Sequence, residues 1–94
     1  VRHESDVKAF VDTCVEQYGK INVAFNNAGI FMTPAEVQDI PFDNFMDIIT
    51  TNTAGTFLGM KYEIPHMRRT GGGSIVNMAS VAGHAGFRTT AHYN

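Results

Sequence analysis

Apolar residues recur at steps of three and four near the start of the chain, a spacing that places them on one face of a helix. This stripe comprises Val7, Phe10, Val11, Cys14, Val15 and Tyr18. Ser5 stands where an N-cap is expected, and Gly19 stands where a helix typically stops. The pattern therefore predicts a first helix between Ser5 and Gly19 that buries its apolar stripe.

A short apolar run, INVAF at Ile21–Phe25, follows this helix. Its length and its β-branched residues are typical of a strand that is buried on both faces. The NNAG element, Asn26–Gly29, ends the run, and a loop with Pro34 and Pro41 comes next. We therefore predict a buried strand that leads into a loop.

A second and longer helical pattern begins after Pro41. Its expected buried stripe comprises Phe42, Phe45, Met46, Ile49, Thr53, Phe57, Met60, Ile64 and Met67. Pro65 should kink or end this helix, because its ring removes a backbone hydrogen bond to the preceding turn. The glycines Gly71–Gly73 predict a turn, and the run SIVNMA at Ser74–Ala79 predicts a second strand.

The predicted order of elements is helix, strand, helix, strand. Strands that alternate with helices long enough to cross over form parallel sheets, and the crossover is right-handed. In open sheets of this α/β class, ligands bind beyond the carboxyl ends of the strands. The NNAG element and Ser80 both follow a predicted strand directly, so we expect both at a ligand-binding edge.

The size and composition of the chain indicate one small globular domain. It has 94 residues, of which 44% are hydrophobic and 17% charged, and this balance argues against a disordered segment. Seven basic and nine acidic residues give a net charge of −2, and neither sign forms a block. A nucleic-acid surface or a polybasic membrane patch is therefore not expected, since both need clustered lysine and arginine.

The single cysteine, Cys14, excludes an internal disulfide and fits a reducing cytosol, so we expect a cytoplasmic protein. No apolar run approaches the roughly eighteen residues that span a bilayer, and we expect neither a membrane span nor a signal segment. The chain enters a helical pattern directly at Val1, which indicates further sequence upstream. No metal site is expected, because paired ligand spacing is lacking, and we expect surface or loop positions for His3, His66, His84 and His92.

Three polar residues near the predicted ligand-binding edge carry candidate chemistry. Ser80 can hold a substrate oxygen by a hydrogen bond, and Tyr93 can exchange a proton with it. A tyrosine has an unperturbed pKa of about 10, so it needs a nearby cation, which on a helix would lie one turn further on. Asn52 lies in the long helical pattern, where it is either a locally bonded polar residue or a kink whose freed backbone groups hold water near the site.

Each motif also has a purely structural interpretation. Ala28 and Gly29 let a backbone approach a ligand closely, but Asn and Gly are also the usual residues of a turn that ends a strand. Ser80 alone is equally typical of a turn, and Tyr93 alone of core or surface packing. The order of the motifs along the chain is therefore more informative than any one of them.

This ordered set resembles the short-chain dehydrogenase/reductase family. NNAG ends one strand, Asn52 lies in the TNTAG of the next helix, GGGSIVNMAS leads into the next strand, and Ser80 precedes Tyr93 by the expected interval. The resemblance covers essentially the whole chain. It implies a partial Rossmann-type doubly wound parallel sheet from a three-layer α/β/α sandwich. Residues 1–94 would then be the central part of a single NAD(P)-binding domain, truncated at both ends.

The resemblance implies roles for single residues. Asn52 matches the active-site asparagine, Ser80 the serine that orients and polarises the substrate oxygen, and Tyr93 the general acid in reduction and general base in oxidation. Ala79 stands where many relatives carry a second serine, and this difference leaves Ser80 undisturbed. His84 lies in a loop that lines the substrate pocket in the family, so it is a candidate for substrate contact.

Cofactor contacts are implied in the same way, and the cofactor is NAD or NADP. Asn26, Ala28 and Gly29 match an element that supports the central sheet and lies along the cofactor ribose. Tyr93 would contact the cofactor as well, and Val1 looks like the residue after the family's adenine-side aspartate. The glycine-rich turn that cradles the pyrophosphate would lie upstream of Val1. The lysine that lowers the tyrosine pKa would lie one helical turn after Tyr93, past the end of the chain.

These matches imply an internal fragment of an NAD(P)-dependent oxidoreductase, which transfers a hydride between a nicotinamide and an alcohol or ketone. We expect the fragment alone to be inactive. The long helix resembles the family's subunit-contact helix, so a homo-oligomer (dimer or tetramer) is expected for the full-length parent. Two alternatives stay open: a non-catalytic nucleotide-binding or scaffold relative on the same fold, and an interaction module built on the face around Phe57, Leu58 and Met60.

Overall fold

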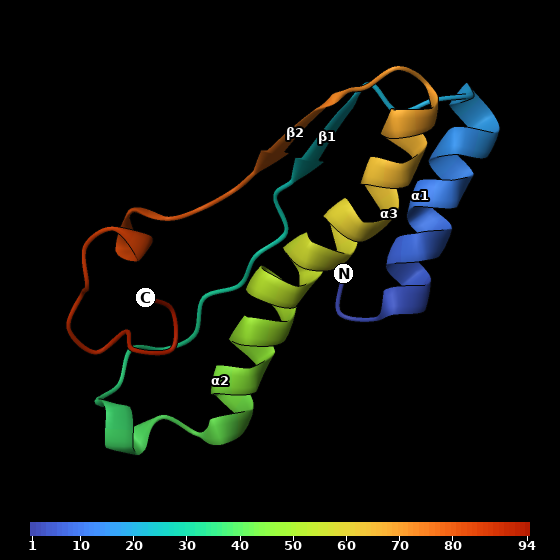
Figure 1. The fold of residues 1–94 in the computed structure, drawn as a ribbon. Coiled ribbons are helices and arrows are strands. Elements are labelled where there is room, and N and C mark those ends of the chain that lie inside the picture. The colour runs from blue at the N-terminus through green and yellow to red at the C-terminus, as the bar shows by residue number, and fades with distance from the viewer.

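Two helical segments lie along one face of a two-stranded sheet in the computed structural model, which describes residues 1–94 (Figure 1). The order along the chain is α1 (Glu4–Tyr18), β1 (Val23–Asn26), α2 (Phe42–Ile48), α3 (Gly55–Arg69) and β2 (Ser74–Asn77). A π-helical turn, η2 (Ile49–Ala54), joins α2 to α3, and short 3₁₀ turns occur at η1 (Val37–Asp39) and η3 (Val81–Gly83). The predicted order of helix, strand, helix, strand is confirmed.

The two strands are parallel, as the crossover between them predicts. Val23 lies opposite Ser74, and Asn26 lies opposite Asn77, so the carboxyl ends of both strands reach the same edge of the sheet. β2 ends at Asn77, earlier than the predicted Ala79. The segments that leave this edge carry the NNAG element and Ser80, as expected from the sequence.

The prediction that the first strand is buried on both faces is wrong. Exposure alternates along β1, where Val23 is 67% and Phe25 56% exposed while Ala24 is half-buried. Both helices lie on the same face of the sheet, so the opposite face has no cover (Figure 1). Ile21, predicted to open the strand, precedes it and is buried.

The N-terminus of α1 differs from the predicted one, whereas its C-terminus is as predicted. Its N-cap is His3 rather than Ser5, because the carbonyl of His3 accepts the N–H of Val7 at 3.2 Å and Ser5 already lies in the first turn. No side chain caps this end. Gly19 ends the helix as predicted, with a φ of +83° and its N–H bonded to the carbonyl of Val15 at 2.7 Å. Glycine suits this left-handed conformation because it has no Cβ.

A small core forms where α1 and α3 meet the sheet. Val11, Ile21 and Met67 are its buried members. Phe10 and Tyr18, which were predicted on the buried stripe, are each 76% exposed. The reason is geometric, because α3 and the sheet cover only the side of α1 that carries Val11. The stripe prediction therefore holds for Val7 and Val11 and fails for Phe10 and Tyr18.

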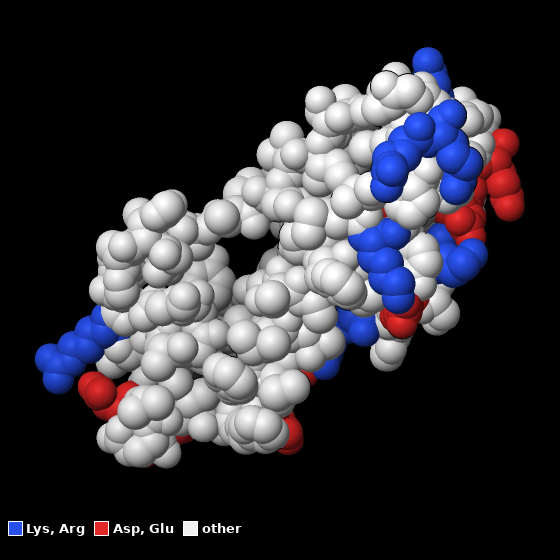
Figure 2. Space-filling view, viewed as in Figure 1, with Lys and Arg blue, Asp and Glu red and all other residues white.

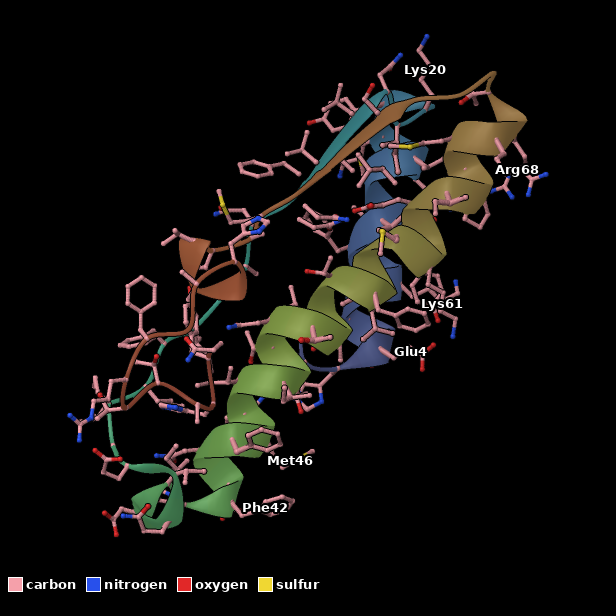
Figure 3. All side chains as sticks on the ribbon, turned by 60° about the vertical axis from the view of Figure 1, so that its left-hand side comes forward. Glu4, Lys20, Phe42, Met46, Lys61 and Arg68 are labelled. Carbon is pink, nitrogen blue, oxygen red and sulfur yellow. The ribbon has the colours of Figure 1, made fainter.

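The buried face of the α2–α3 run differs from the predicted apolar stripe. Its buried residues comprise Ile48, Thr51, Gly55, Gly59, Glu63 and Met67. Of the predicted stripe only Met67 is buried, whereas Phe42 is 72% and Phe57 58% exposed. In Figure 3, Phe42 and Met46 project outward from α2. Most of the apolar stripe thus faces away from the sheet.

Close backbone approach explains why small residues take the inner face. A Cβ added at Gly59 would lie 2.3 Å from Oδ1 of Asn26, and one added at Gly55 would lie 3.0 Å from Cγ2 of Val1. Contacts below about 3 Å leave no room for a methyl group. The helix therefore packs through its glycines, and hydrophobicity alone does not identify its buried side.

Pro65, which was expected to kink or end the helix, lies inside α3, and the predicted glycine turn follows the helix. The helix runs through Pro65 to Arg69, so proline does not end it. Proline removes a single backbone donor, and Met67, buried in the core, anchors the last turn. The predicted glycine turn is confirmed by Gly71 and Gly72, whose φ values are +95° and +113°.

The molecule is elongated, with extents of 48 × 26 × 15 Å and a radius of gyration of 15.7 Å. A compact chain of this length would have a radius of gyration of about 12 Å. Only 11 of the 94 residues are buried, so much of the apolar surface stays uncovered. No helix combines the length and apolar character needed to cross a membrane.

Candidate active site

A pocket of about 160 Å³ lies beyond the carboxyl ends of the two strands. Its lining residues are Asn27, Ala28, Gly29, Asn52, Met78, Ala79, Ser80, Gly83 and Tyr93. The end of β1 positions Asn27, Ala28 and Gly29, and the end of β2 positions Met78, Ala79 and Ser80. The π-helical turn η2 positions Asn52. The structure thus brings Asn52, Ser80 and Tyr93 to one cavity, although they are widely separated in the sequence.

Asn52 clamps the chain that follows the NNAG element. Its Oδ1 accepts the N–H of Ile30 at 2.8 Å, and its Nδ2 donates to the carbonyl of Ile30 at 2.9 Å. The helix departs from α geometry at this residue, as its poor helix propensity suggested. The Asn52 carbonyl accepts the hydroxyl of Thr56 at 3.0 Å. Both the backbone and the side chain of Asn52 are therefore engaged.

Ser80 sits where the chain leaves β2 and enters η3. Its Oγ accepts the N–H of Ala82 at 3.2 Å, which caps this 3₁₀ turn. A serine hydroxyl has one donor hydrogen besides its acceptor sites. Since the backbone uses Oγ as an acceptor, the O–H remains available to donate to a ligand oxygen in the pocket.

Tyr93 is half-buried and reaches the pocket from the last residues of the chain. Its N–H donates to the carbonyl of Thr90 at 2.8 Å, but none of the chain's hydrogen bonds involves its hydroxyl. Its ring packs edge-on against Phe31, with centroids 4.9 Å apart and planes at 89°. The phenol is therefore oriented by its neighbouring ring and is free to bond a ligand.

Asn26 has a different neighbourhood from Ala28 and Gly29. Its Nδ2 donates to Oε2 of Glu63 at 3.1 Å and to Oδ1 of Asn77 at 3.0 Å, so its side chain is directed at α3 and β2. Asn26 does not line the 160 Å³ pocket, whereas Ala28 and Gly29 do. The buried Glu63 was not predicted from the sequence, and its one cue is its place one turn after Gly59 on the inner face.

Val1 lies on the helical side of the sheet, away from Ser80 and Tyr93. It lines a larger groove of about 540 Å³ between α1, α3 and β1, and adjoins Gly55. His84 is exposed, directly follows η3 and does not line the pocket. The two cavities share only Asn27 and Ala28.

His92 lies in a loop, one of the two positions expected for it, but it is buried, since this residue is only 3% exposed. Its ring lies against that of Phe31, with centroids 6.4 Å apart, and its Nδ1 has no hydrogen-bond partner. His92 is buried because its segment folds back on the loop after β1, a contact that its position beside Tyr93 in the sequence does not indicate.

Charge is concentrated far from the pocket. Figure 2 shows lysine and arginine gathered over α1 and the end of α3, whereas only scattered charged groups appear around α2 and the C-terminal segment. On the α1–α3 surface, the hydrogen bond from Lys61 lowers the pKa of Glu4, and the bond to Glu4 raises the pKa of Tyr62. Glu4 and Lys61 lie side by side in Figure 3. None of the pocket-lining side chains is charged.

The family to which the chain belongs follows from its similarity to known proteins. A family model described as short chain dehydrogenase matches residues 1–94. The chain belongs to the short-chain dehydrogenase family. A trans-4-hydroxycyclohexanecarboxylate dehydrogenase from Sinomonas cyclohexanicum is 44% identical over 90% of this chain and 32% of its own length. A cyclohexanol dehydrogenase from Acinetobacter sp. (strain SE19) is 36% identical over 94% of this chain and 35% of its own length.

Solved structures agree with this assignment to the short-chain dehydrogenases. An NAD⁺-bound xylitol dehydrogenase superposes with a TM-score of 0.94 at 40% identity, over 98% of this chain and 35% of that protein. The chain is thus a partial Rossmann-type α/β segment, as the sequence resemblance implied. It spans about a third of the length of the curated short-chain dehydrogenases it matches.

Proposed function

We propose that this chain supplies the central part of a single NAD(P)-binding domain in an NAD(P)-dependent oxidoreductase. The reaction transfers a hydride between a nicotinamide and a carbon that bears an alcohol or a carbonyl group. The observation that carries the proposal is the meeting of Asn52, Ser80 and Tyr93 at one pocket beyond the parallel strands. Ligands of α/β sheets bind at this edge, and proton exchange with an alcohol needs the groups gathered there.

The residues present fit a bound nicotinamide. Ala28 contributes only a methyl group and Gly29 only backbone to the pocket wall, and the lining is uncharged beside two hydroxyl groups. Ala28, Gly29 and Tyr93 would hold the cofactor at this edge. When bound, NAD or NADP supplies the hydride acceptor or donor.

The chain's own residues manage the proton and the oxygen. In alcohol oxidation, the Tyr93 phenolate takes the proton of the substrate hydroxyl as the carbon gives up its hydride; in reduction the phenol returns that proton. The O–H of Ser80 donates to the substrate oxygen, since its Oγ already accepts the N–H of Ala82. Asn52 holds the chain at Ile30 and thereby keeps the pocket wall in place.

The substrate class we propose is a secondary alcohol on a six-membered ring, or its ketone. Two relatives are named for cyclohexane alcohols, the trans-4-hydroxycyclohexanecarboxylate and cyclohexanol dehydrogenases. The pocket suits such a ring, because Met78, Ala79 and Ala28 give it an apolar wall beside the hydroxyls of Ser80 and Tyr93. A ring without a charged substituent, such as cyclohexanol, needs no charged partner, and no charged side chain lines the pocket.

The deciding variant is Tyr93→Phe in the full-length protein that contains this chain. Turnover of cyclohexanol with NAD⁺ or NADP⁺ should fall by about 100-fold or more, because removal of a general acid–base group typically costs this much. Dinucleotide affinity, measured by fluorescence titration, should change little. Tyr62→Phe is the matched control, because its hydroxyl bonds Glu4 on the α1–α3 surface.

Two outcomes would contradict this assignment. A Tyr93→Phe variant that keeps most of its turnover would remove Tyr93 from the reaction. A wild-type protein that binds the dinucleotide but turns over no alcohol or ketone of this class would favour the alternative, a non-catalytic nucleotide-binding or scaffold protein on the same fold.

A further inference from the structure

The loop formed by residues 30–36 runs beside the segment that carries Tyr93. The N–H of Ala35 donates to the carbonyl of Thr89 at 2.8 Å, and the guanidinium of Arg88 lies 3.6 Å from the carboxylate of Glu36. Figure 1 shows the C-terminal end of the chain lying against this loop. The two segments are therefore joined by contacts outside the 160 Å³ pocket.

Phe31 is the residue of this loop that touches Tyr93 directly. The two rings meet edge to face, with centroids 4.9 Å apart and planes at 89°, and the Phe31 ring also lies against His92. Edge-to-face pairs favour one relative orientation over others. Phe31 does not line the pocket, so it restrains the Tyr93 ring from outside the space that a substrate would occupy.

This contact matters because no hydrogen bond within the chain orients the phenol. The hydroxyl of Tyr93 takes part in none of the chain's hydrogen bonds, so its direction depends on how the ring is packed. Phe31 is itself held in place, because Asn52 bonds both the N–H and the carbonyl of Ile30, the residue before it. His92, the residue before Tyr93, is only 3% exposed and packs against the Phe31 ring, so it restrains the Tyr93 side of the contact.

We infer that Phe31 is a positioning residue for Tyr93. Asn52 holds the backbone at Ile30, next to Phe31, and the Phe31 ring holds the Tyr93 ring. The inference rests on the proposed function, because a positioned phenol matters only if Tyr93 exchanges a proton. Loss of the Phe31 ring would let the Tyr93 ring reorient and would lower the fraction of molecules with the hydroxyl turned to the substrate oxygen.

The test compares Phe31→Leu and Phe31→Tyr in the full-length enzyme. Phe31→Leu should lower kcat by about three- to tenfold with KM for the dinucleotide unchanged, which corresponds to the strength of an edge-to-face pair. Phe31→Tyr keeps the ring and should restore most of kcat. Phe87→Leu is the matched control, because Phe87 is similarly exposed at 50% and has no aromatic partner.

Ring contact is measured separately from activity, in protein labelled with ¹³C in its tyrosine rings. The NMR resonances of Tyr93 should move in Phe31→Leu and stay in Phe87→Leu. Unmoved resonances, or a wild-type kcat in Phe31→Leu while Tyr93→Phe is inactive, would overturn the inference alone. If Tyr93→Phe stays active, the proposed function fails and the positioning role fails with it, although the resonance shift persists.

Discussion

At the scale of single residues, the amide of Asn26 joins three elements. It donates to Glu63 on α3 and to Asn77 on β2 from its own place at the end of β1. Gly59 allows this, because any Cβ there would lie 2.3 Å from Oδ1 of Asn26. The family resemblance implies that Asn26 supports the cofactor, and we propose that it acts indirectly, by holding the strand end in place.

This geometry makes Gly59→Ala destabilising despite the better helix propensity of alanine. The added methyl group displaces the Asn26 amide from its two hydrogen bonds, and we expect a net loss of about 1 kcal/mol in the free energy of unfolding. In an Asn26→Ala background the same change should be neutral or stabilising. Urea unfolding of the full-length protein measures both, and an equal loss in the two backgrounds would show that Asn26 is not the obstacle.

At the scale of elements, the α2–α3 run has two faces with opposite roles. Its glycines pack inward, and its large apolar residues are exposed along the outer side, as Figure 3 shows for Phe42 and Met46. A contiguous apolar face of this kind typically marks a surface that another protein covers. We propose that a second copy of the full-length protein covers it, which agrees with a homo-oligomer.

Phe57→Glu tests that proposal, since Phe57 is 58% exposed on this face. A charge buried in a subunit contact has no partner, so self-association should weaken at least about tenfold, seen by light scattering during size-exclusion chromatography. Val37→Glu is the control, because Val37 is 69% exposed but lies in η1, outside the face. An unchanged mass for Phe57→Glu at low protein concentration would rule out this face as the contact.

At the scale of the whole molecule, the chain buries few of its residues. With 11 of 94 residues buried, one face of the sheet bare and a radius of gyration of 15.7 Å, its hydrophobic stabilisation is small. Figure 2 shows a deep hollow between the helices and the C-terminal segment that nothing in the chain fills. The exposed β1–β2 face also presents Val23, Phe25 and Val76 to water.

We therefore expect the isolated ninety-four residues to show no dinucleotide-dependent turnover and to bind a hydrophobic dye such as ANS strongly. The open strand edge adds a tendency to aggregate. Absorbance at the NADPH band and dye fluorescence measure these properties. Cooperative unfolding together with reduction of a ketone by the isolated chain would contradict the expectation.

Most elements and the identity of the edge that bears the pocket were predictable from the sequence. Periodicity located α1, the long helical run and both strands, because each follows local rules of spacing and turn chemistry. Gly19 and the glycine turn at Gly71–Gly72 were predictable for the same reason, since positive φ is a local property of the backbone. The order of motifs also indicated the family, which the family model confirms.

Tertiary structure alone decided which faces are buried and how the pocket is held. Phe10, Tyr18 and Phe57 are apolar yet exposed, whereas Gly59 and Glu63 are buried, because burial depends on which elements lie opposite and how closely their backbones approach. The same dependence hid the buried position of His92 and the contact of Phe31 with Tyr93. Spacing along a chain records its periodicity, but it carries no information about the distance between segments that meet only after folding.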